Sequence, residues 1–413
     1  MTSEMTVSPG SSIPSGTGTG TSAGPTLLTP RHIGDVNRSR VLQAFCDHGP
    51  LTRAQLARLA SVPRATIGAI VQGLMDDGLL EDYGPVHSPG KVGKPGSPVW
   101  FRPDAARCVA IAFDPAGISA ALVSARGEVL ARGRSELDTY TADAASLAAA
   151  ATRAASSVMP EAGGILGIGV AIPGVCDTDK GIVLGSTPVP GVTGGGLVKA
   201  LEAALGGIAR VDNDARVQAL GEKWFGLGRG RASFASVQTG AGLGVGLVIN
   251  GVLYRGEDGR TGEIGHTVVD RAGIKCSCGL TGCWETIATL RWLRAQAAQR
   301  GLADAGAMTS TKLVALADGG DAGARELLDE YAANLSVGIV NLVHLLGLRC
   351  IVLHGDVVGG GEQLLAAIDE NVQSRLLGHF KDEVTIELSG LNSDAALLGA
   401  AGLVLSETFA IAV

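Results

Sequence analysis

Ten consecutive residues are the most informative part of the sequence: Cys276-Ser277-Cys278-Gly279-Leu280-Thr281-Gly282-Cys283-Trp284-Glu285. They place three thiols within eight positions, and His266 lies ten residues upstream, in Gly262-Glu263-Ile264-Gly265-His266. Three cysteines and one histidine suit a closed tetrahedral zinc site, and the two glycines permit the tight turns that bring the sulfurs together. The alternative is a scatter of buried thiols beside a chance histidine. We predict that zinc is held by four ligands: His266, Cys276, Cys278 and Cys283.

The same two segments resemble the signature of the ROK family, which contains repressors, sugar kinases and unassigned reading frames. The family pattern is Gly-Glu-x-Gly-His followed by Cys-x-Cys-Gly-x-x-Gly-Cys-x-Glu, and residues 262–285 contain it in full. The resemblance implies that the zinc is structural and supports a loop that contacts a sugar through Glu263, His266 and Glu285. It also implies a two-lobed, actin-like ATPase (ribonuclease-H-like) α/β fold, and it covers nearly all of residues 31–413.

Composition limits the remaining possibilities. The chain has 413 residues, 46% of them hydrophobic, which is enough for two or three domains with cores of their own. No apolar run has the length of a membrane span, and the N-terminus lacks the features of a signal peptide. The other four cysteines are far apart, which favours a reduced cytoplasmic protein over a disulfide framework.

The N-terminal region divides into a tail and a mildly basic module. Residues 1–30 are rich in Ser, Thr, Gly and Pro, and we predict that they are disordered. Residues 31–102 carry nine Lys/Arg against six Asp/Glu, whereas the whole chain has a formal net charge of −7. This difference indicates that nucleic acid, if it binds, binds at this end of the chain.

The pattern of residues 31–102 predicts a winged helix-turn-helix domain. A first helix covers Asn37 to His48, Thr52 caps a second helix, and Ser61 is a candidate cap for a third. The third helix has one apolar stripe at helical spacing: Ile67, Ile70, Val71 and Leu74. Two short strands follow it: Leu79–Tyr83 and Val99–Phe101. A small helical interaction module is the alternative.

In a winged helix-turn-helix, the third helix enters the major groove and the wing reaches phosphate or the minor groove. The candidate contacts on the third helix are Arg64, Thr66 and Gln72, and Arg64 can bond guanine edges. Lys91 and Lys94 lie in the Gly/Pro-rich wing between the two strands. These five residues are the predicted DNA-binding set.

Residues 103–413 predict a two-lobed α/β body, because strands alternate with helices twice. The first set comprises strands Cys108–Phe113, Ile118–Val123, Val129–Ala131 and Gly167–Ile172 and a helix over 142–158. The second comprises strands Ser236–Gly240 and Gly244–Ile249 and helices over 285–299 and 322–346.

Between the two sets, Val211-Asp212-Asn213-Asp214 follows an apolar segment and leads into a helix. The family resemblance implies that Asn213 binds a sugar hydroxyl and that Asp214 matches the general base of the kinases, which accepts the hydroxyl proton. The local sequence alone also fits an Asx turn that caps the helix.

The nucleotide side departs from the family pattern. Kinase members have Asp-x-Gly-Gly-Thr where this chain has Asp114-Pro115-Ala116-Gly117-Ile118, so Ile118 offers no hydroxyl and Ala116 hinders close phosphate approach. Kinase members have a double glycine near adenosine, and in this chain the matching segment is Leu353-His354-Gly355-Asp356. The Gly-rich loop at 239–244 is better preserved. On the sugar side, Pro188 replaces an asparagine. We therefore expect that the protein does not bind ATP and that no residue, Asp214 included, acts in catalysis.

Taken together, these features predict a sugar-responsive DNA-binding transcriptional regulator, a repressor of carbohydrate-metabolism genes. A sugar or sugar phosphate would bind between the lobes, and a homodimer or homotetramer would bind a palindromic operator. One alternative is an ATP-dependent hexose kinase with a regulatory DNA-binding domain. Another is a DNA-binding protein that senses a component of a sugar-transport system instead of a small molecule.

Overall fold

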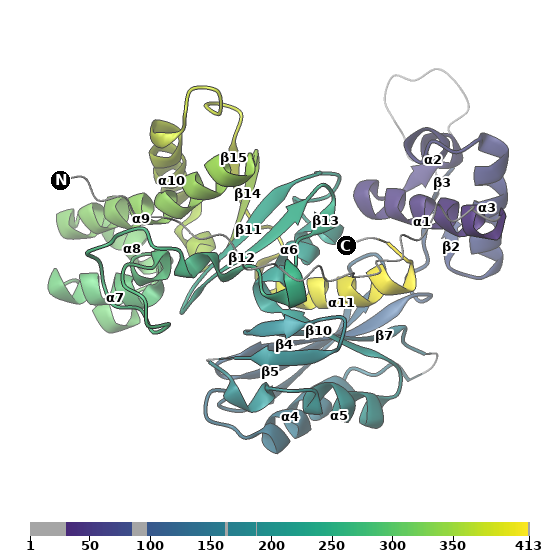
Figure 1. The fold of residues 1–413 in the computed structure, drawn as a ribbon, viewed down its shortest axis with the longest axis horizontal. Coiled ribbons are helices and arrows are strands. Elements are labelled where there is room, and N and C mark those ends of the chain that lie inside the picture. The colour runs from purple at the N-terminus through teal and green to yellow at the C-terminus, as the bar shows by residue number, and fades with distance from the viewer. Residues whose placement is uncertain (1–29, 85–96, 162–163, 187, 412–413) are drawn as a thin grey trace, which may run out of the picture.

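The computed structural model describes residues 30–84, 97–161, 164–186 and 188–411. The chain forms a small helical part and two larger α/β lobes, which lie side by side with two helices between them (Figure 1). Among the described residues, no helix combines the length and the apolar character needed to cross a membrane.

The N-terminal part has the element order that the sequence predicts. Three helices, α1 (Pro30–His48), α2 (Arg53–Leu59) and α3 (Arg64–Asp76), pack beside an antiparallel sheet of order β1-β3-β2. The strands of this sheet are β1 (Leu51–Thr52), β2 (Leu80–Asp82) and β3 (Pro98–Phe101). Thr52 caps α2 as expected, in a capping box with Gln55. Strand β1 was not predicted, because two residues are too short to show a pattern.

The start of α3 corrects one prediction. Ser61 does not cap this helix, which has Pro63 at the N-cap position and no side-chain cap. The fixed backbone angle of Pro63 sets the helix entry instead, and Ser61 adopts a left-handed conformation with φ of 54°. The apolar stripe of α3 is narrower than predicted, since Ile70 is half-buried whereas Ile67 and Val71 are fully buried.

The first lobe is built on a five-stranded sheet of order β10-β7-β4-β5-β6. Its strands are β4 (Arg107–Asp114), β5 (Gly117–Ser124), β6 (Val129–Glu136), β7 (Gly167–Ile172) and β10 (Ala209–Asn213). Strands β10, β7 and β4 are parallel, and β5 and β6 add an antiparallel edge. Helices α4 (Ala144–Ser156) and α5 (Gly196–Leu205) cover one face. A small hairpin, β8 (Val175–Asp177) and β9 (Ile182–Gly185), lies between them in sequence.

The second lobe repeats this pattern with sheet order β13-β12-β11-β14-β15. Its strands are β11 (Phe234–Thr239), β12 (Leu243–Ile249), β13 (Val252–Leu253), β14 (Cys350–Gly355) and β15 (Thr385–Leu388). The outer face carries α7 (Leu290–Gln299), α8 (Ser310–Asp318), α9 (Ala322–Leu346) and α10 (Gly361–Arg375). The helix predicted over 285–299 begins only at Leu290, because a 3-10 helix, Trp284–Thr286, ends the cysteine loop first.

Helices α6 (Asp214–Phe225) and α11 (Ala395–Thr408) lie between the two sheets and join the lobes (Figure 1). They pack closely through glycine: a Cβ on Gly399 of α11 would lie 1.7 Å from the backbone oxygen of Val217 in α6. Helix α6 therefore packs directly on α11, and its first residue follows directly from β10.

Candidate functional site

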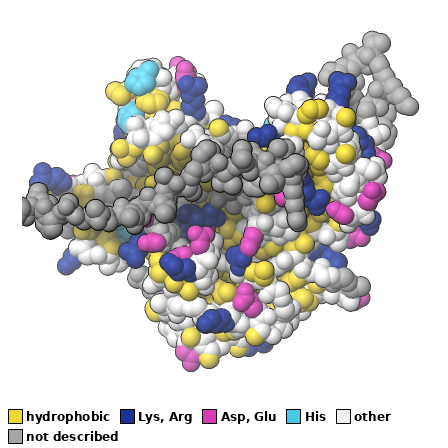
Figure 2. All heavy atoms as spheres, turned by 45° about the vertical axis from the view of Figure 1, so that its right-hand side comes forward, with side chains coloured by type: hydrophobic (Ala, Val, Ile, Leu, Met, Phe, Trp, Pro, Cys, Tyr) yellow, Lys and Arg dark blue, Asp and Glu magenta, His cyan; other side chains and the backbone are white. Residues whose placement is uncertain are grey.

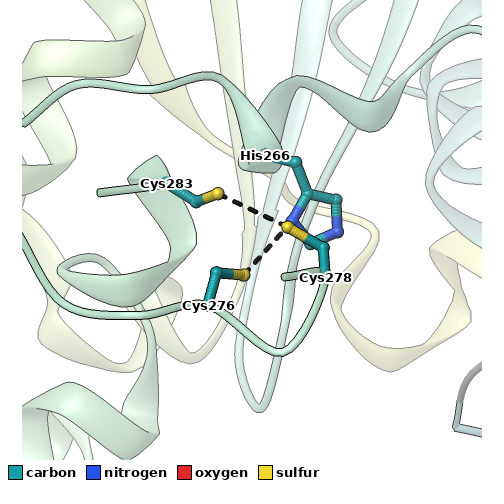
Figure 3. Close-up of side chains that lie close together, drawn as sticks. All are labelled: His266, Cys276, Cys278 and Cys283. Atoms are coloured by element: carbon teal, nitrogen blue, oxygen red, sulfur yellow. Dashed lines mark hydrogen bonds between the residues drawn. The ribbon is translucent and has the colours of Figure 1, made fainter. Parts of the chain in front are cut away.

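The four predicted metal ligands lie together. Their ligand atoms are all within 4.8 Å of one another in a set formed by His266, Cys276, Cys278 and Cys283. Cys276 Sγ is 3.5 Å from His266 Nδ1, and Cys278 Sγ is 3.6 Å from Cys283 Sγ (Figure 3). Zinc bonds of about 2.3 Å to sulfur and about 2.0–2.1 Å to nitrogen give tetrahedral edges of roughly 3.5–3.8 Å. The donor set and its spacing therefore fit a tetrahedral metal ion of the zinc type.

Glycine and tryptophan hold the cysteine loop in this shape. Gly282 has a φ of 78°, and a Cβ there would lie 1.5 Å from the backbone oxygen of Asp270. Trp284 is fully buried and donates a hydrogen bond from Nε1 to the Asn334 carbonyl of α9 at 2.9 Å. A Cβ on Gly338 would lie 2.2 Å from the Trp284 ring, so this glycine makes room for it. The loop is thus anchored to α9, a role for Trp284 that sequence reasoning missed.

Both predicted glutamates border the cluster. Glu285 Oε1 is 3.6 Å from His266 Nδ1 and accepts a hydrogen bond from Cys276 Sγ at 3.0 Å. Glu263 Oε2 is 3.7 Å from His266 Nε2. The imidazole therefore turns Nδ1 toward the sulfurs and leaves Nε2 on the side of Glu263, where a ligand can reach both.

The protonation of the thiols depends on their surroundings. Burial raises the pKa of Cys276 and raises that of Cys283 to about 12. A backbone hydrogen bond from Leu280 lowers the pKa of Cys278. Because thiolates are the metal-binding form, metal loading at this cluster must release protons and weaken in acid.

Asn213 and Asp214 lie where β10 ends and α6 begins. Asn213 Oδ1 accepts from the Arg216 backbone N at 3.1 Å, and its Nδ2 donates to the Gly174 carbonyl at 2.9 Å. Asn213 is therefore the helix cap that the local sequence allowed. Each of these contacts uses only one lone pair or one hydrogen of the amide, so a ligand can still bond to it.

Asp214 lies within electrostatic reach of Glu263, a residue of the second lobe. Burial raises the pKa of Asp214, the Glu263 carboxylate raises it further, and the Ala215 backbone N–H, which donates to Asp214 at 2.9 Å, lowers it. The structure thus brings the start of α6 close enough to the second lobe for Asp214 to interact with Glu263.

A buried ion network that the sequence did not reveal holds this junction. Arg216 is 1% exposed and donates to Asp212 Oδ1 at 2.7 Å and to the Gly259 carbonyl at 2.6 Å. Arg255 donates to the other oxygen of Asp212 at 2.9 Å. Asp212 and Arg216 are four residues apart, a spacing that was visible in the sequence, but their partners come from distant loops.

The side of the cleft that matches the kinase nucleotide loops is occupied by contacts within the protein. Arg134 pairs with Asp114 at 2.7 and 3.1 Å, and Ile118 is fully buried in the core of the first lobe. The Thr239 hydroxyl donates to the His354 carbonyl at 3.1 Å and accepts from the Val357 backbone N at 3.0 Å. These groups therefore already have partners inside the chain.

The predicted DNA-contacting residues divide into two sets. Arg64, Thr66 and Gln72 are exposed on α3, and Gln72 donates to Asp76 at 2.8 Å. Lys91 and Lys94 lie outside the described residues.

The N-terminal part is attached to the first lobe by Arg126, between β5 and β6, which pairs with Glu81 at 2.7 Å, and to the interlobe helices by contacts of Arg229 and Phe409. Arg229, in the loop after α6, donates to the carbonyls of Cys46 and Phe45 at 2.9 and 3.3 Å, close to the end of α1. Phe409, directly after α11, stacks on Phe101 of β3 with ring centroids 5.3 Å apart and planes 4° apart. The contacts of Arg229 and Phe409 each link the small helical part to a helix that lies between the sheets.

The sequence profile of the ROK family matches residues 108–407. The chain belongs to the ROK family. It is 25% identical to the xylose repressor of Bacillus subtilis (strain 168) over 376 residues, which are 90% of this chain and 95% of the repressor. It is 33% identical to the glucokinase of Halalkalibacterium halodurans over 253 residues, which are 58% of this chain and 76% of the kinase.

A solved ROK family transcriptional regulator, a homologue of the Escherichia coli Mlc protein, has the same fold as this ROK chain. The TM-score is 0.74 at 24% identity, over 92% of this chain and 98% of the regulator. This likeness confirms the predicted α/β fold class and extends beyond the residues that the family profile matches.

Proposed function

We propose that this ROK protein is a sugar-responsive transcriptional repressor that binds operator DNA in the cytoplasm as a homo-oligomer. One observation carries the proposal: the helical part with the winged helix-turn-helix arrangement contacts the lobes at the end of α6. At the other end of α6, Asp214 lines the interlobe cavity and Asn213 caps the helix beside it. The match to a xylose repressor over 90% of this chain supports this function.

The exposed face of α3 is the proposed DNA-reading surface. Arg64 and Thr66 lie in its first turn, where recognition helices contact base edges. On the face in Figure 2, Lys/Arg and Asp/Glu side chains of the described residues are interspersed over the molecule. Because the chain has a net charge of −7, binding should depend on local contacts at α3 and the wing more than on overall attraction.

The proposed metal is zinc, with His266 bound through Nδ1 and with three cysteine sulfurs as the other ligands. Bound zinc would supply only structure, fixing the loop that carries Glu263 and Glu285. Trp284 positions the same loop from behind by its contact with α9. Structural zinc contributes about 10–16 kcal/mol to the folding of small peptides, so its loss should loosen a short loop strongly.

The proposed effector is a sugar held by Asn213, Asp214, Glu263, Glu285 and His266 Nε2. Carboxylates accept from hydroxyls, the amide both donates and accepts, and polyol recognition needs several such groups fixed at once. Asp214 and Glu263 come from the two sides of the cleft, so a sugar that bonds both would draw the lobes together. Closure would then shift α6 and the parts attached to its end.

The effector acts only through its different affinity for the two lobe arrangements, typically about 1–3 kcal/mol, or 5–150-fold. Helix α6 can transmit this difference because nearly all of its length is buried. Arg229 lies four residues beyond the end of α6 and bonds α1 directly. Movement of α6 would therefore change the position of the DNA-reading helix.

The test is binding of the purified protein to labelled DNA from upstream of its own gene, at one fixed salt concentration, with and without a panel of sugars. Fixed salt is required because phosphate contacts make affinity fall steeply as salt rises. We expect tight binding that one sugar weakens at least fivefold. Binding that no sugar alters would instead favour a protein partner, such as a transport component.

A sugar kinase is the second candidate, supported by Asp214 and by the 33% identity to a glucokinase. The Arg134–Asp114 pair and the engaged Thr239 hydroxyl argue against it, because they use the groups that would face phosphates. ATP-dependent phosphorylation of a hexose that is lost in Asp214→Ala would establish the kinase instead.

A further inference from the structure

A cavity of about 580 Å³ lies between the lobes, beside the proposed sugar residues. It is bordered by β4, β5 and β6 on one side and by α6, β14 and the start of α11 on the other. Asp214 lines it, so the cavity continues from the sugar site. Pockets for small-molecule ligands typically measure about 300–1,000 Å³, and this cavity falls within that range.

Two buried polar atoms in the cavity wall have no hydrogen-bond partner among the described residues. Gln218 of α6 is 7% exposed, and its Oε1 is unpaired. His354 of β14 is 2% exposed, and its Nε2 is unpaired, with Glu222 Oε1 3.4 Å away. An unsatisfied buried polar atom costs about 1–3 kcal/mol, and both atoms are closed to solvent here, so a ligand recovers that cost when the Gln218 amide or the His354 ring turns toward the cavity.

The charges around the cavity disfavour an anion. Its charged lining groups are three carboxylates and two guanidiniums: Asp114, Asp214, Asp394, Arg132 and Arg134. Both guanidiniums are already paired, Arg132 with Asp394 at 2.7 and 2.6 Å and Arg134 with Asp114. Burial lowers the pKa of His354 to about 4, so this histidine adds no positive charge near neutral pH. A phosphate would have to break an ion pair and face uncompensated carboxylates.

We propose that the effector is a neutral saccharide of two rings, with the second ring in the interlobe cavity against Gln218 and His354. This inference rests on the proposed function, in which the first sugar ring of the effector binds at the residues from Asn213 to Glu285. A second ring offers both donors and acceptors, which suits an amide, an imidazole and paired carboxylates better than phosphates do.

The test is isothermal titration calorimetry on the full-length protein. The probes are maltose, cellobiose and xylobiose, then glucose and xylose, then glucose 6-phosphate and a non-hydrolysable ATP analogue. We expect one disaccharide to bind at least tenfold more tightly than its own monosaccharide, and neither phosphate compound to bind as tightly.

Two variants locate the second ring. Ala396→Phe places a large side chain into the cavity from the half-buried first turn of α11. The variant should bind the disaccharide no more tightly than the monosaccharide, and its affinity for the monosaccharide should not change. Gln218→Met keeps the volume but removes the acceptor, and should weaken disaccharide binding about five- to tenfold. Gln299→Met, an exposed change at the end of α7, is the control and should have no effect.

Each outcome decides the inference. It is overturned if disaccharides bind no better than monosaccharides, if Ala396→Phe leaves disaccharide binding intact, or if the ATP analogue binds more tightly. In the first two cases the cavity holds ordered water only, and the proposed function survives when a monosaccharide still weakens operator binding. If no saccharide of either size binds or weakens operator binding, the proposed function fails as well.

Discussion

The two ends of α6 differ in chemistry although twelve buried or half-buried residues connect them directly. The N-terminal end carries half-buried Asn213 and Asp214, of which Asn213 retains bonding capacity and Asp214 lines the interlobe cavity. The C-terminal end is aromatic and closed: Trp224 is 2% exposed, and Arg229 already bonds α1. A ligand can therefore act at one end, while the other end, about 18 Å away, can respond by moving as a unit. Substitutions at the two ends should have separable effects on sugar binding and on DNA response.

The largest effect is expected at the loop that faces the N-terminal end. Cys276→Ser removes one metal ligand, and we expect loss of zinc and a rise of at least about a hundredfold in the sugar concentration that releases DNA. Operator binding without sugar should remain. Zinc is measured by mass spectrometry and DNA release by fluorescence anisotropy. Leu280→Ala, an exposed change in the same loop, is the control. A zinc-free Cys276→Ser protein with a normal sugar response would refute this role of the metal.

Asp214→Asn tests the N-terminal end itself. Losing a charge-assisted hydrogen bond of about 1.5–3 kcal/mol should weaken sugar binding about 10–100-fold. Operator binding without sugar should not change.

The same substitution should change the pH dependence of stability. The pKa of Asp214 is raised above 3.8 in the folded protein, so this group stabilises the fold below pH 3.8 and loses that contribution as pH rises through the raised pKa. The free energy of unfolding of Asp214→Asn should therefore increase relative to that of wild type as pH rises above 3.8. Urea denaturation of both proteins at several pH values measures this difference. Equal pH profiles for wild type and Asp214→Asn would contradict the burial argument.

Arg229→Met tests the opposite end. The change keeps the aliphatic bulk and removes both hydrogen bonds to α1. Sugar should therefore bind with normal affinity. The factor by which sugar lowers operator affinity should be about five- to tenfold smaller than in wild type. The control is Arg231→Met in the same loop, because Arg231 pairs with Glu387 of the second lobe and does not touch α1. If both variants respond alike, the link through Arg229 is not specific.

The smallest effect is expected from the ring contact. Phe409→Leu removes a stack worth about 0.5–1.5 kcal/mol, so amide hydrogen exchange in β3 should speed up about two- to tenfold with sugar affinity unchanged. Phe380→Leu, which removes a ring contact with His379 in the second lobe, is the control. Unchanged exchange in β3 would show that the stack does not stabilise the attachment.

The sequence predicts those parts of the site that depend on local spacing. The Cys/His cluster came from one short segment and one nearby histidine, and the structure brings these four residues together. The order of helices and strands at 37–101 was also correct except for β1, because apolar stripes and capping residues are local. The cap at Ser61 was wrong because Pro63 controls the backbone there.

The remaining parts depend on contacts between distant segments. Gln218 and His354 meet at one cavity only because α6 and β14 border the same space, and nothing in their local sequence shows this. Arg216 looks like an ordinary helical arginine until the Gly259 loop folds onto it. The partners of Arg229 and Phe409 likewise lie far away in the sequence, at Cys46 and Phe101.

The stack of Phe409 on Phe101 has a consequence for the order of assembly during synthesis. Phe101 leaves the ribosome roughly three hundred residues before Phe409, a delay of about 15–60 s at typical elongation rates. The helix-turn-helix can form its local elements early, but its ring contact with Phe409 cannot form until α11 has been made. A nascent chain would therefore present a DNA-reading helix that is not yet under the control of the sugar cleft.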